Sequence, residues 1–263
     1  MNKVIICDLD GTLLGTKGKL NAKTIAIVRE FVRKGGTFII ATGRLDHDIK
    51  YIEKKLDIQG AYRISQNGAV IRKHSNEFVW KKVIDPRIAK DIVKYLRDNN
   101  LRVEISDAYY RYFPSPRRGG NIEFIDHSII DPEYIRKIGK DIHPTLLLTF
   151  GNKKIFDSVI GVVDTRFGEQ VDAIMTSPSS LEFLSKGISK GAAIKRILQD
   201  FSFQPTKICA IGDSENDISM FDVSDVSYAV ANADTNIKRK ADEVFSTVEA
   251  GISAFMDENR ESE

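Results

Sequence analysis

Cysteine and histidine, the residues of disulfide frameworks and zinc sites, are scarce in this chain of 263 residues. Its two cysteines, Cys7 and Cys209, each lie in a short apolar run typical of a buried strand, where a free thiol usually serves packing. The four histidines are far apart, with no spacing that suits a metal site: His47, His74, His127 and His143. A disulfide-stapled secreted domain is therefore excluded, and free thiols predict a reducing, cytoplasmic location.

Long apolar runs and an excess of one charge are also missing. Only four apolar residues separate Lys3 from Asp8, which is too short for a signal peptide or a membrane span. No later apolar run approaches membrane length. Lysine and arginine number 39 against 37 aspartates and glutamates, and they are spread along the chain. We therefore expect neither a membrane nor a nucleic acid as a partner, and no pattern indicates an oligomeric state.

The chain does contain an alternation of apolar strands and amphipathic helices. Continuous apolar runs such as residues 4–7 are typical of strands buried on both faces of a parallel sheet. The first predicted elements are strands at 4–7, 38–41 and 62–65, helices from the cap Asn21 to Gly35 and over about 46–56, and a hairpin turn at Asn67-Gly68. The pattern returns with a helix capped by Ser189 and a strand at 208–211. These regions predict an α/β core.

Between the two α/β regions the pattern changes. From about residue 85 to residue 180, one or two strands at a time alternate with single helices, which is typical of an α+β unit. An insertion is tolerated where both ends of a surface loop lie close together. We therefore predict a split core, with its first half at 1–82 and its second half at 183–263, and an inserted domain at 83–182.

Polar residues follow the predicted buried strands or begin the next helix. They are Asp8 and Asp10, Thr42, Lys190, and Asp213 with Asp217. Because the carboxyl ends of parallel strands form one crevice, we expect these side chains to converge. Crowded carboxylates need a cation, and an all-oxygen ligand set favours Mg²⁺, which binds few carboxylates and commonly a substrate phosphate as well. The pattern therefore predicts phosphoryl chemistry.

Four segments resemble, in order, the motifs of the haloacid dehalogenase superfamily. They are Asp8-Leu9-Asp10-Gly11-Thr12-Leu13, Thr42-Gly43-Arg44, Lys190-Gly191 and Gly212-Asp213-Ser214-Glu215-Asn216-Asp217. The insertion after Gln66-Asn67-Gly68-Ala69 is similar to that of the Cof-type branch, which carries a type IIB α/β cap. The resemblance implies a Rossmann-like parallel-sheet core, an inserted α+β cap over the crevice, and a Mg²⁺-dependent phosphatase.

The resemblance also implies a role for each residue of the motifs. Asp8 is expected to be the nucleophile that becomes an aspartyl-phosphate, and Asp10 the acid and base. Thr42 and Lys190 are expected to stabilise the transferring phosphoryl group. The full expected sets are Asp8, Asp10, Thr42 and Lys190 for catalysis; Thr42, Gly43, Arg44, Asn67, Lys190 and Asn216 for substrate; and Asp8, Asp10 through its carbonyl, Asp213 and Asp217 for the metal. Asp217 has the alternative role of orienting Lys190.

Alternatives remain open for the reaction and for the substrate. A sugar phosphomutase has a similar core and cap, and a phospho-accepting receiver domain joins the same residue types but is about half this size. A dehalogenase is disfavoured, because a leaving halide needs no proton from Asp10. The substrate is expected to be a sugar phosphate or a similar small monoester. The Arg117-Arg118 loop is a hypothetical contact for an anionic substrate.

Overall fold

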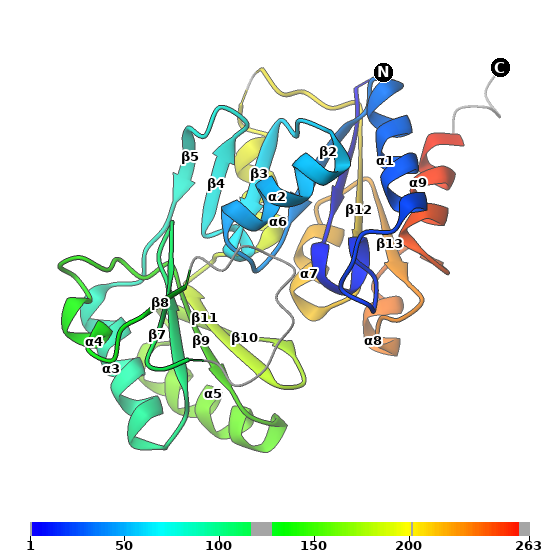
Figure 1. Cartoon of the computed structure of the whole chain (residues 1–263). Coiled ribbons are helices and arrows are strands. Elements are labelled where there is room, and N and C mark those ends of the chain that lie inside the picture. Colours follow the sequence, from blue (N-terminus) through cyan, green and yellow to red (C-terminus); the bar gives the residue numbers. More distant parts are fainter. Residues whose placement is uncertain (1, 117–127, 201, 258–263) are drawn as a thin grey trace.

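The computed structural model describes residues 2–116, 128–200 and 202–257, which fold around two β-sheets (Figure 1). The larger sheet has the strand order β14-β13-β12-β1-β2-β3-β4-β5. Its strands are β1 (Lys3–Cys7), β2 (Thr37–Ala41), β3 (Tyr62–Ser65), β4 (Val70–Lys73), β5 (Phe78–Lys81), β12 (Lys207–Gly212), β13 (Val226–Val230) and β14 (Glu243–Phe245). Within this sheet as described, the pairs β3–β4 and β4–β5 are antiparallel and all other pairs are parallel. The predicted α/β class with a parallel core sheet is confirmed.

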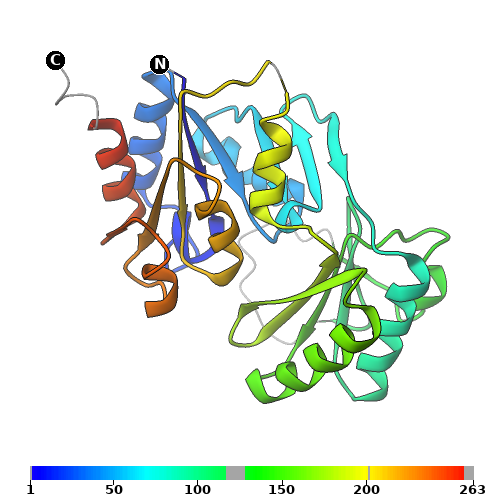
Figure 2. The ribbon, with the colours of Figure 1, turned by 180° about the vertical axis from the view of Figure 1, so that it is seen from behind.

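Helices cover both faces of the larger sheet (Figures 1 and 2). One face packs against α1 (Ala22–Arg33), α2 (Asp46–Leu56) and α9 (Val248–Asp257). The other packs against α6 (Lys190–Ile197), α7 (Glu215–Phe221) and α8 (Thr235–Lys238). Cys7 and Cys209 are free thiols buried in the first of these layers, as the sequence predicts.

The smaller sheet has the order β10-β11-β9-β6-β7-β8 and is antiparallel except between β7 and β8. Its strands are β6 (Val103–Ser106), β7 (Arg111–Phe113), β8 (Ser128–Ile130), β9 (Leu146–Phe150), β10 (Val171–Ser177) and β11 (Ser180–Ser185). Its helices are α3 (Pro86–Asp98), α4 (Tyr134–Lys137) and α5 (Lys153–Phe167), which pack on one face. We call this unit, which lies between β5 and α6 in the sequence, the cap.

The chain passes from the core to the cap and back at two adjacent points. The Ser185 hydroxyl donates a hydrogen bond to the Val83 carbonyl at 2.9 Å, so the outgoing and returning segments lie side by side. Strand β11 continues to Ser185 within the smaller sheet. The return to the core therefore comes slightly after the boundary at residue 182 that we predicted, because pairing with β10 holds residues 183–185 in the cap sheet.

Local sequence signals explain where the core helices begin and end. Asn21 caps α1 by accepting a hydrogen bond from the Thr24 amide at 2.9 Å, and Gly35, with φ of +86°, ends that helix. Ser189 caps α6 by accepting from the Ala192 amide at 3.1 Å. The first residue of α6 is thereby fixed at the edge of the sheet where β1 and β12 end.

Candidate active site

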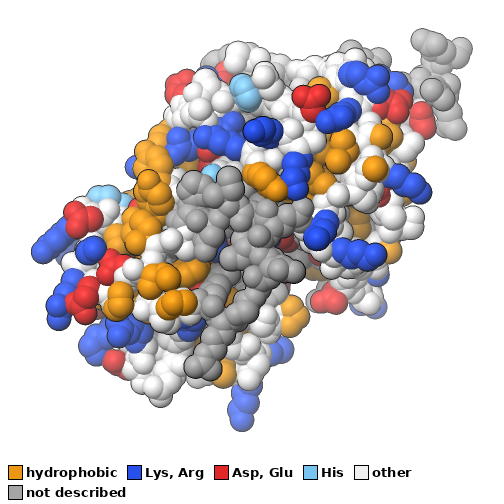
Figure 3. Space-filling view, in the orientation of Figure 1, with side chains coloured by type: hydrophobic (Ala, Val, Ile, Leu, Met, Phe, Trp, Pro, Cys, Tyr) orange, Lys and Arg blue, Asp and Glu red, His pale blue; other side chains and the backbone are white. Residues whose placement is uncertain are grey.

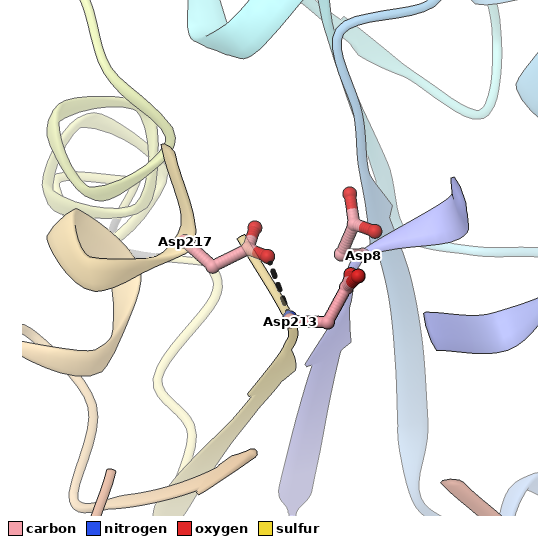
Figure 4. Close-up of side chains that lie close together, drawn as sticks. All are labelled: Asp8, Asp213 and Asp217. Atoms are coloured by element: carbon pink, nitrogen blue, oxygen red, sulfur yellow. Dashed lines mark hydrogen bonds between the residues drawn. The ribbon is translucent and has the colours of Figure 1, made fainter. Parts of the chain in front are cut away.

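The residues that follow β1 and β12 bring three carboxylates together. Asp8 follows β1, Asp213 follows β12, and Asp217 lies in the first turn of α7. Their ligand oxygens lie within 4.8 Å of one another, and Figure 4 shows the three side chains converging from these elements. Adjacent parallel strands carry the first two residues to the same edge of the sheet, since β1 and β12 are paired along their length.

A buried lysine neutralises part of this charge. Lys190, the first residue of α6, is fully buried, and its Nζ lies 2.5 Å from Asp8 Oδ1 and 2.6 Å from Asp217 Oδ1. Burial alone lowers a lysine pKa, but the two carboxylates outweigh it and hold the pKa of Lys190 above its usual value. The ammonium group therefore stays charged and fixes the Asp8 carboxylate in position.

Asp217 is held in a single orientation by its own loop. Its Oδ2 accepts hydrogen bonds from the Asp213 amide at 2.9 Å and the Ser214 amide at 3.0 Å, which completes a capping box with Ser214 at the start of α7. Its other oxygen binds Lys190. Asp217 therefore contacts both its own loop and Lys190, the residue that one of its two expected roles is to orient.

The carboxylates carry more negative charge than Lys190 offsets. Burial raises the pKa of Asp8 well above its usual value, against the opposing effect of Lys190. Burial likewise raises the pKa of Asp213 to about 6, although the Thr12 hydroxyl donates to its Oδ1 at 2.7 Å. Groups with raised pKa values in a shared pocket are typical of functional sites. An all-oxygen cluster of this kind can hold a divalent cation.

Gly11 makes the close approach of the two acidic loops possible. Its φ is +81°, and a Cβ there would lie 2.2 Å from Asp213 Oδ2. Asn232 also contacts this point, with its amide nitrogen 3.1 Å from the Gly11 carbonyl and 3.4 Å from Asp213 Oδ2. The sequence motif places glycine at this position for a steric reason.

Replacing Gly11 with alanine should therefore lower the free energy of unfolding by more than its backbone angle alone explains. Positive φ costs a non-glycine residue about 1–2 kcal/mol, and the contact with Asp213 adds about 1–3 kcal/mol of overpacking. Gly18→Ala is the matched control, because Gly18 has φ of +65° and nothing within 4 Å of its added Cβ. Urea unfolding measures both variants, and equal losses would contradict the steric explanation.

Thr42 and Arg44 follow β2, the strand that pairs with β1. Thr42 follows β2 and is buried, and its hydroxyl accepts a hydrogen bond from the Arg44 amide at 3.2 Å. The Arg44 guanidinium binds both carboxylate oxygens of Asp10, each at 2.7 Å. The Asp10 side chain is about half exposed, at 51%. Of the predicted metal ligands, Asp8, Asp213 and Asp217 form the carboxylate cluster, and the Asp10 carboxylate is not part of it.

Asn67 and Asn216, two further residues expected at the site, are linked by a hydrogen bond between their side chains. The Asn216 amide nitrogen donates to Asn67 Oδ1 at 2.9 Å. Asn67 in turn donates to Glu182 Oε2, on the cap strand β11, at 2.5 Å. Hydrogen bonds thus link Asp8, Lys190 and Asp217, Thr42, Arg44 and Asp10, and Asn67 and Asn216, and Gly43 lies next to Asn67. Arg117 and Arg118 lie outside the described residues.

Three neighbours of the site were not predicted from sequence: Thr12, Asn232 and Glu182. Thr12 and Asn232 contact Asp213 from two different loops. Glu182 had a usable signal, because it is the one charged residue in the apolar run Leu181-Glu182-Phe183-Leu184. A buried charge in a strand needs a partner, and that requirement marks it as a residue of interest.

The surface and the helices add two observations. Lysine, arginine, aspartate and glutamate side chains are interspersed over the face shown in Figure 3. Among the described residues, no helix combines the length and the apolar character that crossing a bilayer requires.

Comparison with known proteins places the chain among phosphatases. Residues 5–256 match a family described as haloacid dehalogenase-like hydrolase. The chain is 25% identical to 5-amino-6-(5-phospho-D-ribitylamino)uracil phosphatase YwtE of Bacillus subtilis, with 97% of each protein covered. A haloacid dehalogenase-like hydrolase structure from B. subtilis superposes with a TM-score of 0.84 at 25% identity, over 97% of this chain and 99% of that one. The subclass IIB sugar phosphatase BT4131 shares the fold, with a TM-score of 0.80 at 18% identity over 99% of both chains.

Proposed function

This chain belongs to the haloacid dehalogenase-like hydrolases and is a phosphoric monoester hydrolase; on this basis we propose that it is of the Cof-type branch and that Asp8 carries a phosphoryl intermediate beside a bound Mg²⁺. The observation that carries the proposal is the buried ammonium of Lys190 shared by Asp8 and Asp217. The ammonium group holds one carboxylate oxygen of Asp8 in place at the carboxyl end of the parallel strands. Ligands of such sheets bind at this end, so Asp8 is placed to attack a bound phosphate group.

In the first step the Asp8 carboxylate attacks phosphorus and the ester bond to the leaving oxygen breaks. Asp10 gives its proton to that oxygen, which departs as an alcohol. In the second step water attacks the phosphorus of the aspartyl-phosphate and passes a proton to Asp10. Inorganic phosphate leaves, and both carboxyl groups return to their starting states. Thr42 and Lys190 donate hydrogen bonds to the phosphoryl oxygens during both steps.

Asp10 can act as an acid only after its pair with Arg44 opens. Both of its oxygens are bound by the Arg44 guanidinium in the structure. A guanidinium binds phosphate with the same two-point geometry as it binds a carboxylate. We assign Arg44, with Gly43 and Asn67, to the substrate contacts, so that an arriving phosphate draws Arg44 from Asp10 and releases the acid for protonation.

The cluster of Asp8, Asp213 and Asp217 fits Mg²⁺ by the chemistry of its donors, which are carboxylate oxygens in a buried setting. The Asp10 carbonyl is a further candidate ligand. When bound, the metal offsets the charge of the carboxylates and of the phosphate. Lys190 and the amides of Asp213 and Ser214 orient Asp217.

Removal of divalent metal is expected to reduce turnover by about 10²-fold or more, because a bound cation supplies several kcal/mol of charge stabilisation. The assay measures phosphate release after chelation and during titration with Mg²⁺. Asp213→Asn is the matched variant, and it should need a higher Mg²⁺ concentration for half-maximal activity. Turnover that continues unchanged in chelator would rule out the proposed metal.

The substrate proposed here is a sugar phosphate or a similar small monoester. The relative YwtE is named for a phosphorylated ribityl compound, and BT4131 is named a sugar phosphatase. A panel of phosphorylated sugars, sugar alcohols and cofactors, assayed with Mg²⁺, tests this by release of inorganic phosphate. Interconversion of isomers without phosphate release would identify a phosphomutase instead. We place the protein in the cytoplasm, because its two buried cysteines are free.

A further inference from the structure

One glutamate of the cap is buried against the phosphate-binding loops of the core. Glu182 lies on β11 and is only 7% exposed. Its Oε2 accepts a hydrogen bond from Asn67 at 2.5 Å, and a Cβ on Gly43 would lie 3.5 Å from its Oε1. The carboxylate therefore sits between two core loops that the proposed function assigns to the substrate.

The Asn67 side chain also accepts a hydrogen bond from a second residue of the core. Asn216, in the first turn of α7, donates from its amide nitrogen to Asn67 Oδ1 at 2.9 Å. An ionised carboxylate can only accept hydrogen bonds, so Asn67 must turn its NH₂ group toward Glu182 and its carbonyl toward Asn216. Asn216 must then turn its own NH₂ group toward Asn67. One fixed charge thus sets the direction of both amides.

Little else orients the Asn216 amide. Its carbonyl oxygen is buried and has no hydrogen-bond partner among the described residues. An amide reversed about its last bond would place two carbonyl oxygens face to face as long as Asn67 keeps its direction. The contact with Asn67 is therefore the interaction that decides the direction of the Asn216 amide.

The loop that carries Asn67 is held in a costly backbone conformation. Gln66 and Asn67 have φ of +52° and +53°, in the left-handed region that favours glycine. Two amide hydrogen bonds hold them there, from Gln66 to the Arg44 carbonyl at 2.9 Å and from Asn67 to the Thr42 carbonyl at 3.0 Å. Such conformations persist where the surrounding structure imposes them, commonly at functional sites. Asn67 is thereby tied to the same loop as Thr42 and Arg44.

We propose that Glu182 is a positioning residue which, through Asn67, makes Asn216 present an N–H group and not a carbonyl oxygen to the transferring phosphoryl group. The inference rests on the proposed function, in which Asn216 contacts that group. The second hydrogen of the Asn216 NH₂ is the donor in question. A carbonyl at the same place would repel a phosphate.

The charge of Glu182 is set by groups from three elements. Burial raises the pKa of Glu182 to about 7, against the effects of Arg111 on β7 and Lys190 on α6, and the Thr176 hydroxyl on β10 also favours the ionised form. A protonated Glu182 can donate to Asn67 and so permits the reversed direction of both amides. The direction is therefore enforced above about pH 7 and released below it.

Glu182→Gln tests the inference, because glutamine has the same shape and no charge. The probe is inorganic phosphate as a competitive inhibitor of p-nitrophenyl phosphate hydrolysis in saturating Mg²⁺. At pH 8 the inhibition constant of the variant should be about tenfold above that of the wild type, the order expected for one charge-linked hydrogen bond. At pH 5.5 the two constants should converge. The ionisation of phosphate itself cancels in the ratio of the two enzymes.

Thermal stability supplies a second readout that separates positioning from support of the fold. Because folding raises the pKa of Glu182 from 4.5 to about 7, the folded wild type loses stability as pH rises through that window, and the neutral glutamine does not. The variant should therefore melt higher than the wild type at pH 8 while binding phosphate more weakly. Glu104→Gln is the control, since Glu104 is a buried glutamate on β6 that pairs with Leu148 in the same sheet row as Glu182.

Three results would overturn the positioning role. They are equal inhibition constants at pH 8, a ratio that does not change between pH 5.5 and pH 8, and a loss of phosphate affinity that Glu104→Gln reproduces. Asn216→Ala separates this failure from failure of the proposed function. If Asn216→Ala weakens phosphate binding and Glu182→Gln does not, only the positioning role is lost. If Asn216→Ala has no effect, the assignment of Asn216 to the substrate is wrong.

Discussion

Asp8→Asn should reduce kcat by about 10⁴-fold or more, the order seen when the nucleophile of a covalent catalyst is removed. The amide keeps the shape of the carboxyl group but does not attack phosphorus. Its Oδ1 can still accept the hydrogen bond that Lys190 gives to Asp8 at 2.5 Å. Because burial raises the pKa of Asp8 well above its usual value, the neutral amide should leave the fold at least as stable at pH 7.

The measurement is phosphate release from the best substrate of the panel, with substrate and Mg²⁺ at saturation. Rapid acid quenching of the wild type should trap phosphate on the protein, and the variant should trap none. Asp98→Asn makes the same chemical change on α3, where the side chain is 60% exposed, and should retain full activity. A variant at Asp8 that keeps more than about 1% of turnover would exclude the aspartyl-phosphate, given the losses expected for a nucleophile.

Lys190→Met should be the most destabilising single change in the site. Lys190 is fully buried, and its loss leaves the carboxylates of Asp8 and Asp217 without their cation. Breaking a buried ion pair by removing one partner costs about 3–5 kcal/mol, which corresponds to a fall in Tm of roughly 10 °C for a chain of this size. Activity should fall as well, because the phosphoryl group and Asp8 lose a hydrogen-bond donor.

The destabilisation by Lys190→Met should depend on pH. Without the ammonium group, the pKa of buried Asp8 rises further, so the carboxyl group is protonated at low pH and its burial then costs little. The loss measured by urea unfolding should therefore be larger at pH 8 than at pH 5. Lys195→Met, at an exposed position of the same helix, is the control. An equal loss at both pH values would show that Lys190 stabilises the fold by packing and not by charge.

The sequence predicts the core and most of the site because both depend on short-range signals. The apolar run before Asp8 marks β1, and the cap residues Asn21 and Ser189 mark where helices begin. In a parallel sheet, such strands bring their following loops to one edge, so the meeting of Asp8 with Asp213 follows from local pattern and topology. The fold class was predictable for the same reason.

What the sequence did not predict depends on contacts between distant segments. Arg44 pairs with Asp10, which is 34 positions away, and Glu182 pairs with Asn67, which is 115 positions away. The periodicity of apolar residues does not predict which distant side chains come into contact after folding. The last residues of β11 lie beyond the expected boundary at residue 182, since pairing with β10 holds them in the cap sheet. The strand β5 was not predicted, because pairing with β4 defines it.

The adjacent crossings between core and cap limit how the two sheets can turn relative to one another. With Val83 bonded to Ser185, the two connections lie side by side, and we expect any relative rotation of core and cap to turn about an axis through them. Residues near the axis travel least, and Glu182, three positions before Ser185 in β11, is among them. We therefore expect the hydrogen bond between Glu182 and Asn67 to persist if the cap rotates about this axis, while the far edge of the cap moves furthest.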